Sequence, residues 1–264
     1  MSNSWKLGRF AGIDVFLHPT FLMFLLYLGM TTRSAAVVGL FVAAFACVLL
    51  HEFGHALTAR RFGIATQDIT LYPIGGVARL ERMPRSPGAE VLIALAGPAV
   101  NVAILLVLLL IHFLGGPGEV IPAWFLVNLG FINLMLVAFN LIPAFPMDGG
   151  RVFRALLSGW IGRLRATEIA AGLGRVLAVA FGVWSATQFE WMRVALAAFI
   201  YLAAGAELAS VVADERRRLS AAFGVDTGAW AAPRGHQWVR NAEGVWALTP
   251  LVVTVPVEPQ THWR

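Results

Sequence analysis

Two histidines and a glutamate interrupt one of the most apolar stretches of the chain. His51-Glu52-x-x-His55 follows residues 43–50, which read Ala-Ala-Phe-Ala-Cys-Val-Leu-Leu. Residues four apart lie on one face of a helix, so His51 and His55 can bind the same metal ion. Glu52 is placed to take a proton from a water molecule at that ion. Because ionisable groups are costly in lipid, their presence in such a stretch indicates a functional site.

The composition is that of a membrane protein with several spans. Of the 264 residues, 58% are hydrophobic and 13% are charged, against roughly 25% charged in a soluble domain. The mean hydropathy is +0.73, and apolar runs of about 20 residues, the length that crosses a bilayer, recur along the chain. The net charge of +5 does not indicate a nucleic-acid partner, because the basic residues stand at the ends of the apolar runs. Arginine outnumbers lysine 19 to 1, which hints at a GC-rich prokaryotic genome and a prokaryotic cell membrane.

Six apolar spans are predicted. They cover residues 15–32, 34–59, 90–114, 121–142, 167–188 and 191–212. The expected fold is an all-α polytopic membrane protein with six transmembrane helices and a small membrane-associated β-element after the second. The membrane domain is expected over residues 1–218. A short cytoplasmic tail of unknown role is expected over residues 219–264, where residues 251–255 could form one strand.

The distribution of basic residues orients these spans. With the N-terminus in the cytoplasm, only Arg33 and Arg193 fall in outer loops. Fourteen basic residues then lie on the inner side: Lys6, Arg9, Arg60, Arg61, Arg79, Arg82, Arg85, Arg151, Arg154, Arg163, Arg165, Arg216, Arg217 and Arg218. This positive-inside bias predicts an even number of spans and cytoplasmic termini. It also places His51 and His55 in the cytoplasmic half of the second span.

Two segments break the helical pattern. Residues 69–80 alternate in polarity and are interrupted by Gly75 and Gly76, which predicts strand–turn–strand. Irregular backbone at membrane depth needs cover from protein or water, so we expect this β-element over a cavity on the cytoplasmic side. In the second segment, Pro143 and Pro146 end or break the fourth helix.

A catalytic zinc site usually has three protein ligands, so a third is required. The candidates in or beside apolar spans are Asp148, His112, Glu90, Glu168, Glu207 and Cys47. Asp148 follows the cytoplasmic part of the fourth span, at about the depth of the histidines, and is favoured. His112 lies at the outer end of the third span and is a poor ligand. Cys47, one turn before His51, stays open, and Asp148 could instead serve the turn before Gly149.

Several segments of the chain form one combination of motifs. They are His51-Glu52-x-x-His55, Asn140-x-x-Pro143-x-x-Pro146-x-Asp148-Gly149-Gly150-Arg151, Gly75-Gly76-Val77, Glu90-x-x-Ile93-Ala94-Leu95-Ala96-Gly97-Pro98-x-x-Asn101, and Gly8-Arg9-x-x-Gly12-Ile13 with His18-Pro19-Thr20-Phe21. This combination resembles the site-2 protease family of intramembrane zinc metalloproteases. The resemblance covers about residues 5–215. It implies one Zn²⁺ per chain held by His51, His55 and Asp148, with Glu52 as the general base. It also implies that Asn140 positions the substrate peptide or its oxyanion.

The chain departs from the family in its accessory modules. The tail is too short for the pair of CBS domains that many prokaryotic members carry, and no insertion of the size of a PDZ domain is present. We therefore expect a minimal member of the family. Asn128 and Asn133 are expected to make interhelical hydrogen bonds. The pair Gly97-Pro98 is expected to allow close helix packing or a kink.

The leading hypothesis is an intramembrane zinc endopeptidase that cuts membrane-spanning proteins, with the bilayer as its surroundings and an oligomeric state that the sequence does not indicate. Residues 69–80, with Gly75 and Gly76, could hold an unwound substrate as an added strand. Another membrane-embedded zinc hydrolase is an alternative, but it does not explain Asp148 and the glycines after it. A metal transporter is a second alternative. It would call for ligands spread across the bilayer or for internal repeats, and neither is visible.

Overall fold

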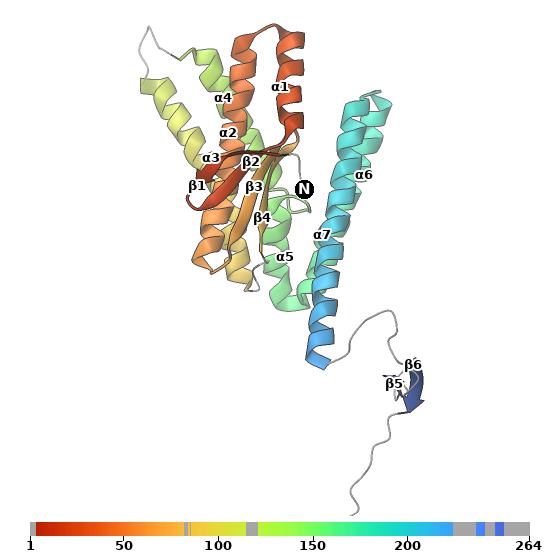
Figure 1. Cartoon of the computed structure of the whole chain (residues 1–264). Coiled ribbons are helices and arrows are strands. Elements are labelled where there is room, and N and C mark those ends of the chain that lie inside the picture. Colours follow the sequence, from red (N-terminus) through yellow and green to blue (C-terminus); the bar gives the residue numbers. More distant parts are fainter. Residues whose placement is uncertain are drawn as a thin grey trace, which may run out of the picture. The chain divides into compact units, whose positions relative to one another are not determined.

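The computed structural model describes residues 4–81, 84, 86–114, 121–223, 236–240 and 246–250. The chain divides into two compact units, Met1–Val211 and Val212–Arg264. Seven helices occur in the described residues (Figure 1). They are α1 (Pro19–Thr32), α2 (Ala35–Arg61), α3 (Pro87–Leu114), α4 (Ala123–Asn140), α5 (Asp148–Ile161), α6 (Arg163–Thr187) and α7 (Trp191–Phe223).

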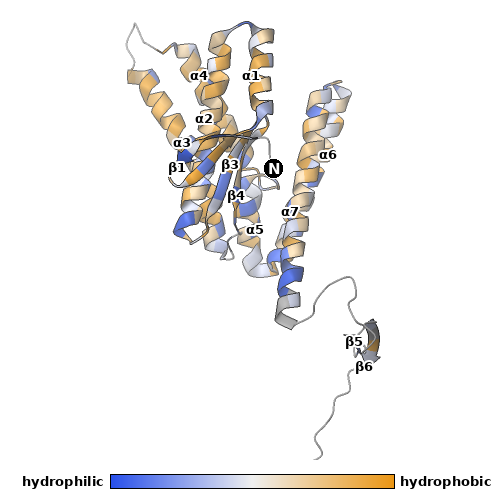
Figure 2. Cartoon of the chain, viewed as in Figure 1, coloured by the Kyte–Doolittle hydropathy of each residue, from blue (hydrophilic) through white to orange (hydrophobic). Residues whose placement is uncertain are grey.

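Five of the described helices, α2, α3, α4, α6 and α7, are long and apolar enough to cross a membrane. Figure 2 shows apolar residues along most of their length. The first predicted span is shorter than expected, because α1 has 14 residues. At 1.5 Å per residue it is about 21 Å long, against roughly 30 Å of hydrocarbon. The prediction of six spans is therefore not confirmed.

The start of α1 explains this difference. Pro19 occupies the first turn, and the His18 side chain accepts a hydrogen bond from the backbone N–H of Thr20, so the helix begins only there. Residues 15–17, which we expected in the first span, belong instead to strand β2 (Ile13–Leu17).

The described fold is mostly helical with a small β-sheet, as expected, but the sheet has four strands and two of them precede α1, so the fold is not all-α. Its strands are β1 (Trp5–Phe10), β2, β3 (Thr66–Tyr72) and β4 (Gly75–Leu80), in that order. The β2–β3 pair is parallel, whereas β1–β2 and β3–β4 are antiparallel. Strands β3 and β4 confirm the predicted strand–turn–strand element, and both pack against α2.

An ion pair links β3 to β4. The Arg79 Nε donates to Asp68 Oδ1 at 2.8 Å, and this hydrogen bond raises the pKa of the Arg79 guanidinium above its ordinary value. Asp68 and Arg79 are partners in the strand register. The pair therefore helps to set the register of β4.

The segment after α4 confirms the predicted helix break and adds a helix that we did not predict. Helix α4 ends at Asn140, and α5 begins at Asp148. A Cβ at Gly150 would lie 2.5 Å from the Ala144 carbonyl carbon. Glycine thus lets the first turn of α5 pack closely on the connecting segment.

The second unit contains a two-stranded antiparallel hairpin, β5 (His236–Arg240) and β6 (Trp246–Pro250). The strand predicted at residues 251–255 lies outside the described residues. The division into a membrane domain over 1–218 and a tail over 219–264 stays a prediction.

Candidate metal centre

Helices α2 and α3 approach each other closely where the two histidines lie. A Cβ at Gly54 would lie 2.7 Å from the Ala96 carbonyl oxygen, so only glycine permits this separation. His51 and His55 are each 5% exposed, on the face of α2 that is turned to α3. Gly54, at the second x-position of His-Glu-x-x-His, thus lets this face of α2 pack closely against α3.

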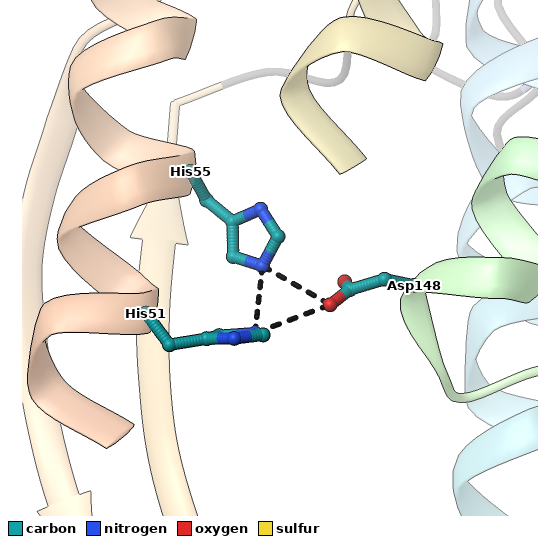
Figure 3. A group of neighbouring side chains, drawn as sticks. All are labelled: His51, His55 and Asp148. Atoms are coloured by element: carbon teal, nitrogen blue, oxygen red, sulfur yellow. Dashed lines mark hydrogen bonds and ion pairs between the residues drawn. The ribbon is translucent and has the colours of Figure 1, made fainter. Parts of the chain in front are cut away.

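The structure brings His51, His55 and Asp148 together (Figure 3). The two Nε2 atoms are 3.0 Å apart, and Asp148 Oδ2 lies 3.2 Å from each. The histidines come from α2, and Asp148, 7% exposed, is the first residue of α5. The break after α4 is what places this carboxylate opposite the histidines.

The protons on the two histidines are determined by their outer partners. His55 Nδ1 is 2.7 Å from the Ile93 carbonyl oxygen, which can only accept, so Nδ1 carries the proton. His51 Nδ1 donates in the same way to Asn101 Oδ1 at 2.5 Å. In its neutral form, each imidazole then has its Nε2 lone pair on the side of the Asp148 carboxylate.

Three electron-pair donors that converge in a buried site fit a zinc ion. Zinc takes imidazole nitrogen and carboxylate oxygen at about 2.0–2.2 Å, and tetrahedral ligands at such lengths are roughly 3.3 Å apart. The observed separations of 3.0–3.2 Å are close to this value. These side chains, held by packing and by their outer hydrogen bonds, could hold the metal.

The other candidate ligands serve different purposes. Glu90 and Glu207 both accept hydrogen bonds from Arg154. Cys47 is buried in an apolar cluster with Leu40, Ala44 and Leu129. Among the described residues, His112 and Glu168 do not belong to the group that could hold a metal.

Strand β4 lies beside Glu52. A Cβ at Gly76 would be 2.8 Å from Glu52 Cγ, so the backbone of β4 approaches this carboxylate directly. Gly75 has φ +138° and open space around it. Of the two glycines singled out by the sequence, Gly76 therefore adjoins the proposed general base.

Asn140 is the last residue of α4 and is half-buried. Within the described residues its amide makes no hydrogen bond to the carbonyls near Pro143. Its assignment to substrate stays a prediction.

Two residues of α3 were not recognised as part of this site from the sequence. A Cβ at Gly97 would lie 2.6 Å from His51 Nε2 and still closer to His55 Nε2. Asn101, fully buried, binds His51. The signal was present in the spacing, because Ile93, Gly97 and Asn101 stand four apart and so share one face of α3.

Comparison with known proteins identifies the family. The family model described as Peptidase family M50 matches residues 39–122 and 118–183, together more than half of the chain. This chain belongs to peptidase family M50. The match includes all three clustered side chains and Glu52, so the M50 assignment and the geometry agree on the same part of the molecule.

Named relatives and a solved structure support the M50 assignment. Zinc metalloprotease MJ0392 of Methanocaldococcus jannaschii is 38% identical over 81% of this chain and 62% of its own length. Stage IV sporulation protein FB of Bacillus subtilis is 24% identical over 72% of this chain and 64% of its own length. The solved site-2 protease from M. jannaschii aligns with a TM-score of 0.62 at 37% identity, covering 78% of this chain and 95% of that one. The chain thus spans less than two thirds of these two named relatives, but nearly all of the solved structure.

Proposed function

We propose that this protein is an intramembrane zinc metalloendopeptidase that hydrolyses peptide bonds in or next to transmembrane segments of membrane proteins. The observation that carries the proposal is the cluster of His51, His55 and Asp148, whose three electron-pair donors converge in a buried site. The glutamate that adjoins the cluster, Glu52, lies on a helix long and apolar enough to span a membrane. Membership of a peptidase family and the names of the relatives agree with it.

The chemistry divides between the metal and the chain. When bound, zinc supplies a Lewis acid that lowers the pKa of water to about 7. Glu52 accepts the proton of the attacking water and delivers it to the nitrogen of the leaving amine. His51, His55 and Asp148 hold the metal at a fixed place beside Glu52, and Asn140 donates its amide N–H to the developing oxyanion.

The substrate is a locally unwound segment of a membrane protein. Strand β4 is an edge strand of the sheet and adjoins Glu52 at Gly76. An extended peptide added to this edge would have its backbone held by main-chain hydrogen bonds next to the general base. This arrangement supports a role for Gly75 and Gly76 in leaving that edge open.

In the proposed orientation, α1 completes six membrane-crossing segments of a prokaryotic cell membrane, both termini are cytoplasmic, and the cluster lies in the cytoplasmic half. The apolar side chains that α1 leaves exposed support this, among them Met23, Leu26, Tyr27 and Met30. The excess of basic residues on the inner side supports the direction.

The test is cleavage of a transmembrane substrate in proteoliposomes by wild type, Glu52→Gln and Glu168→Gln. Glu52→Gln removes the base but keeps the side-chain shape, so cleavage should fall roughly 10²- to 10⁴-fold while zinc content stays that of wild type. Glu168→Gln makes the same change at an exposed carboxylate of α6 and should cleave normally. Full cleavage by Glu52→Gln would contradict the mechanism, and zinc uptake without any cleavage by wild type would favour the transporter alternative.

A further inference from the structure

A chain of three hydrogen bonds runs from the metal cluster through two further helices. His51 Nδ1 donates to Asn101 Oδ1 at 2.5 Å, and Asn101 Nδ2 donates to Asn133 Oδ1 at 2.8 Å. Asn133 Nδ2 then donates to the Leu129 carbonyl at 2.9 Å. We call this chain of hydrogen bonds the relay. It links α2, α3 and α4, and both asparagines are 0% exposed.

The last acceptor determines the direction of every bond in the relay. The Leu129 carbonyl can only accept, so the Asn133 amide must turn its NH₂ group toward it and its oxygen toward Asn101. Asn101 must then turn its own oxygen toward His51. A carboxamide oxygen facing Nδ1 requires the proton on Nδ1, and Nε2 is left free for a metal.

The relay lies where a lipid environment makes such groups costly. An unpaired amide in an apolar interior loses its hydration without compensation, and here the two amides bind each other, His51 and the Leu129 carbonyl. Asn128, on the same helix as Asn133, shows the ordinary alternative: its Nδ2 donates to the Trp124 carbonyl of its own helix, and its side chain takes no part in the relay.

We propose that Asn101 and Asn133 are positioning residues that hold His51 in the orientation and tautomer that bind the metal. Outer partners of this kind fix the ring of a ligating histidine and raise its basicity. Asn101 acts directly on His51, and Asn133 acts through Asn101. The inference rests on the proposed zinc site. It adds α3 and α4 to that site, because their amides fix the orientation and the tautomer of His51.

The test measures zinc affinity of the purified full-length protein by competition with a chromogenic chelator. Asn101→Leu removes the acceptor at similar volume and should weaken zinc binding roughly 10- to 100-fold. Asn101→Asp retains an acceptor for His51 Nδ1 and should stay within about threefold of wild type. Asn133→Leu keeps Asn101 but removes the amide that orients it. Its loss of zinc affinity should lie between those of Asn101→Asp and Asn101→Leu. Asn128→Leu, the same substitution outside the relay, should bind zinc as wild type does.

The visible spectrum of the Co²⁺-loaded protein gives a second readout, because it reports ligand geometry. It should change in Asn101→Leu and Asn133→Leu and be retained in Asn101→Asp. Wild-type zinc affinity in Asn101→Leu would overturn the proposal. Equal losses in Asn101→Leu and Asn101→Asp would also overturn it, because Asn101→Asp keeps the acceptor for His51 Nδ1. If Asn101→Leu does not fold, Asn133→Leu decides by the same two measurements.

These measurements test the positioning role of Asn101 and Asn133 separately from the proposed endopeptidase activity. Zinc and cobalt binding are measured without any substrate, so a wild-type protein that binds zinc but cleaves nothing would overturn only the endopeptidase. A folded wild type that binds no zinc would contradict the metal centre itself and the relay with it.

Discussion

At the scale of single residues, the absence of a side chain at position 97 matters as much as the ligands do. The Cβ of any larger residue there would meet both Nε2 atoms of the histidine pair. It would thus occupy the space next to the atoms that face Asp148 in Figure 3. Gly97 therefore belongs to the metal centre although it offers no ligand.

We predict that Gly97→Ala loses most of its zinc while it still folds as a helical membrane protein. The added methyl group must displace His51, His55 or the metal, because no Cβ is accommodated that close to another atom. Zinc per chain and circular dichroism measure the two effects. Gly88→Ala is the matched control on the same helix, since a Cβ at Gly88 meets nothing within 4 Å. Normal zinc content in Gly97→Ala would contradict this account of the site.

The sequence shows some of these residues more readily than others. The histidine pair is visible because four-residue spacing places both rings on one helix face, and Asp148 was favoured by its depth in the membrane. Gly97 was interpreted as a packing residue, and Asn101 was given no role of its own. A glycine that leaves space for the histidine rings, or an amide that binds the outer nitrogen of a histidine, has no pattern in its own segment of sequence. Its role is visible only when the neighbouring helix is in place.

At the scale of elements, α5 carries Asp148 and is fastened by a buried arginine. Arg154, 0% exposed, donates through Nε to Glu90 of α3 at 2.7 Å and through Nη1 to Glu207 of α7 at 2.9 Å. Its guanidinium also lies 4.8 Å from the centre of the Phe145 ring. This cluster holds the helix that presents the third candidate ligand.

We predict that Arg154→Met lowers the stability of the protein in detergent by about 3–5 kcal/mol, because it leaves buried carboxylates without their partner. Thermal unfolding of the purified protein measures the change. Arg193→Met is the control, since Arg193 pairs with Glu190 at the start of α7 and both side chains are half exposed; its effect should stay within about 1 kcal/mol. An equal effect of the two substitutions would show that the Arg154 cluster does not stabilise α5.

The boundaries of helices and strands were predicted best where the sequence has a clear polarity pattern or a clear break in it. The alternation and glycines of residues 69–80 correctly predicted β3 and β4, and the prolines after Asn140 correctly predicted the end of α4. Strand β2 was missed, because Val15-Phe16-Leu17 continues directly into the apolar α1 and looks like part of one span. Helix α5 was missed, because it is short and mixed in polarity and cannot be told from a loop by hydropathy.

At the scale of the whole molecule, the proposed orientation in the membrane can be tested with cysteines. The chain has one cysteine, Cys47, which is 6% exposed and should resist labelling. We predict that a membrane-impermeant maleimide labels Thr32→Cys, at the end of α1, on intact cells. Ala65→Cys, between α2 and β3, should be labelled only after the cells are opened. Both positions are exposed in the structure. The reverse pattern would contradict cytoplasmic termini and move the metal centre to the outer half of the membrane.

The central claim is that His51, His55 and Asp148 hold one zinc ion beside Glu52. Elemental analysis of the detergent-purified protein tests it most directly, with wild type measured beside His51→Ala, Asp148→Ala and Glu52→Gln. We predict about one zinc per chain in wild type and in Glu52→Gln, and a sharp fall in the two alanine variants, because three protein ligands are needed for a stable site. Little zinc in a well-folded wild type, or an unchanged content in Asp148→Ala, would contradict the claim.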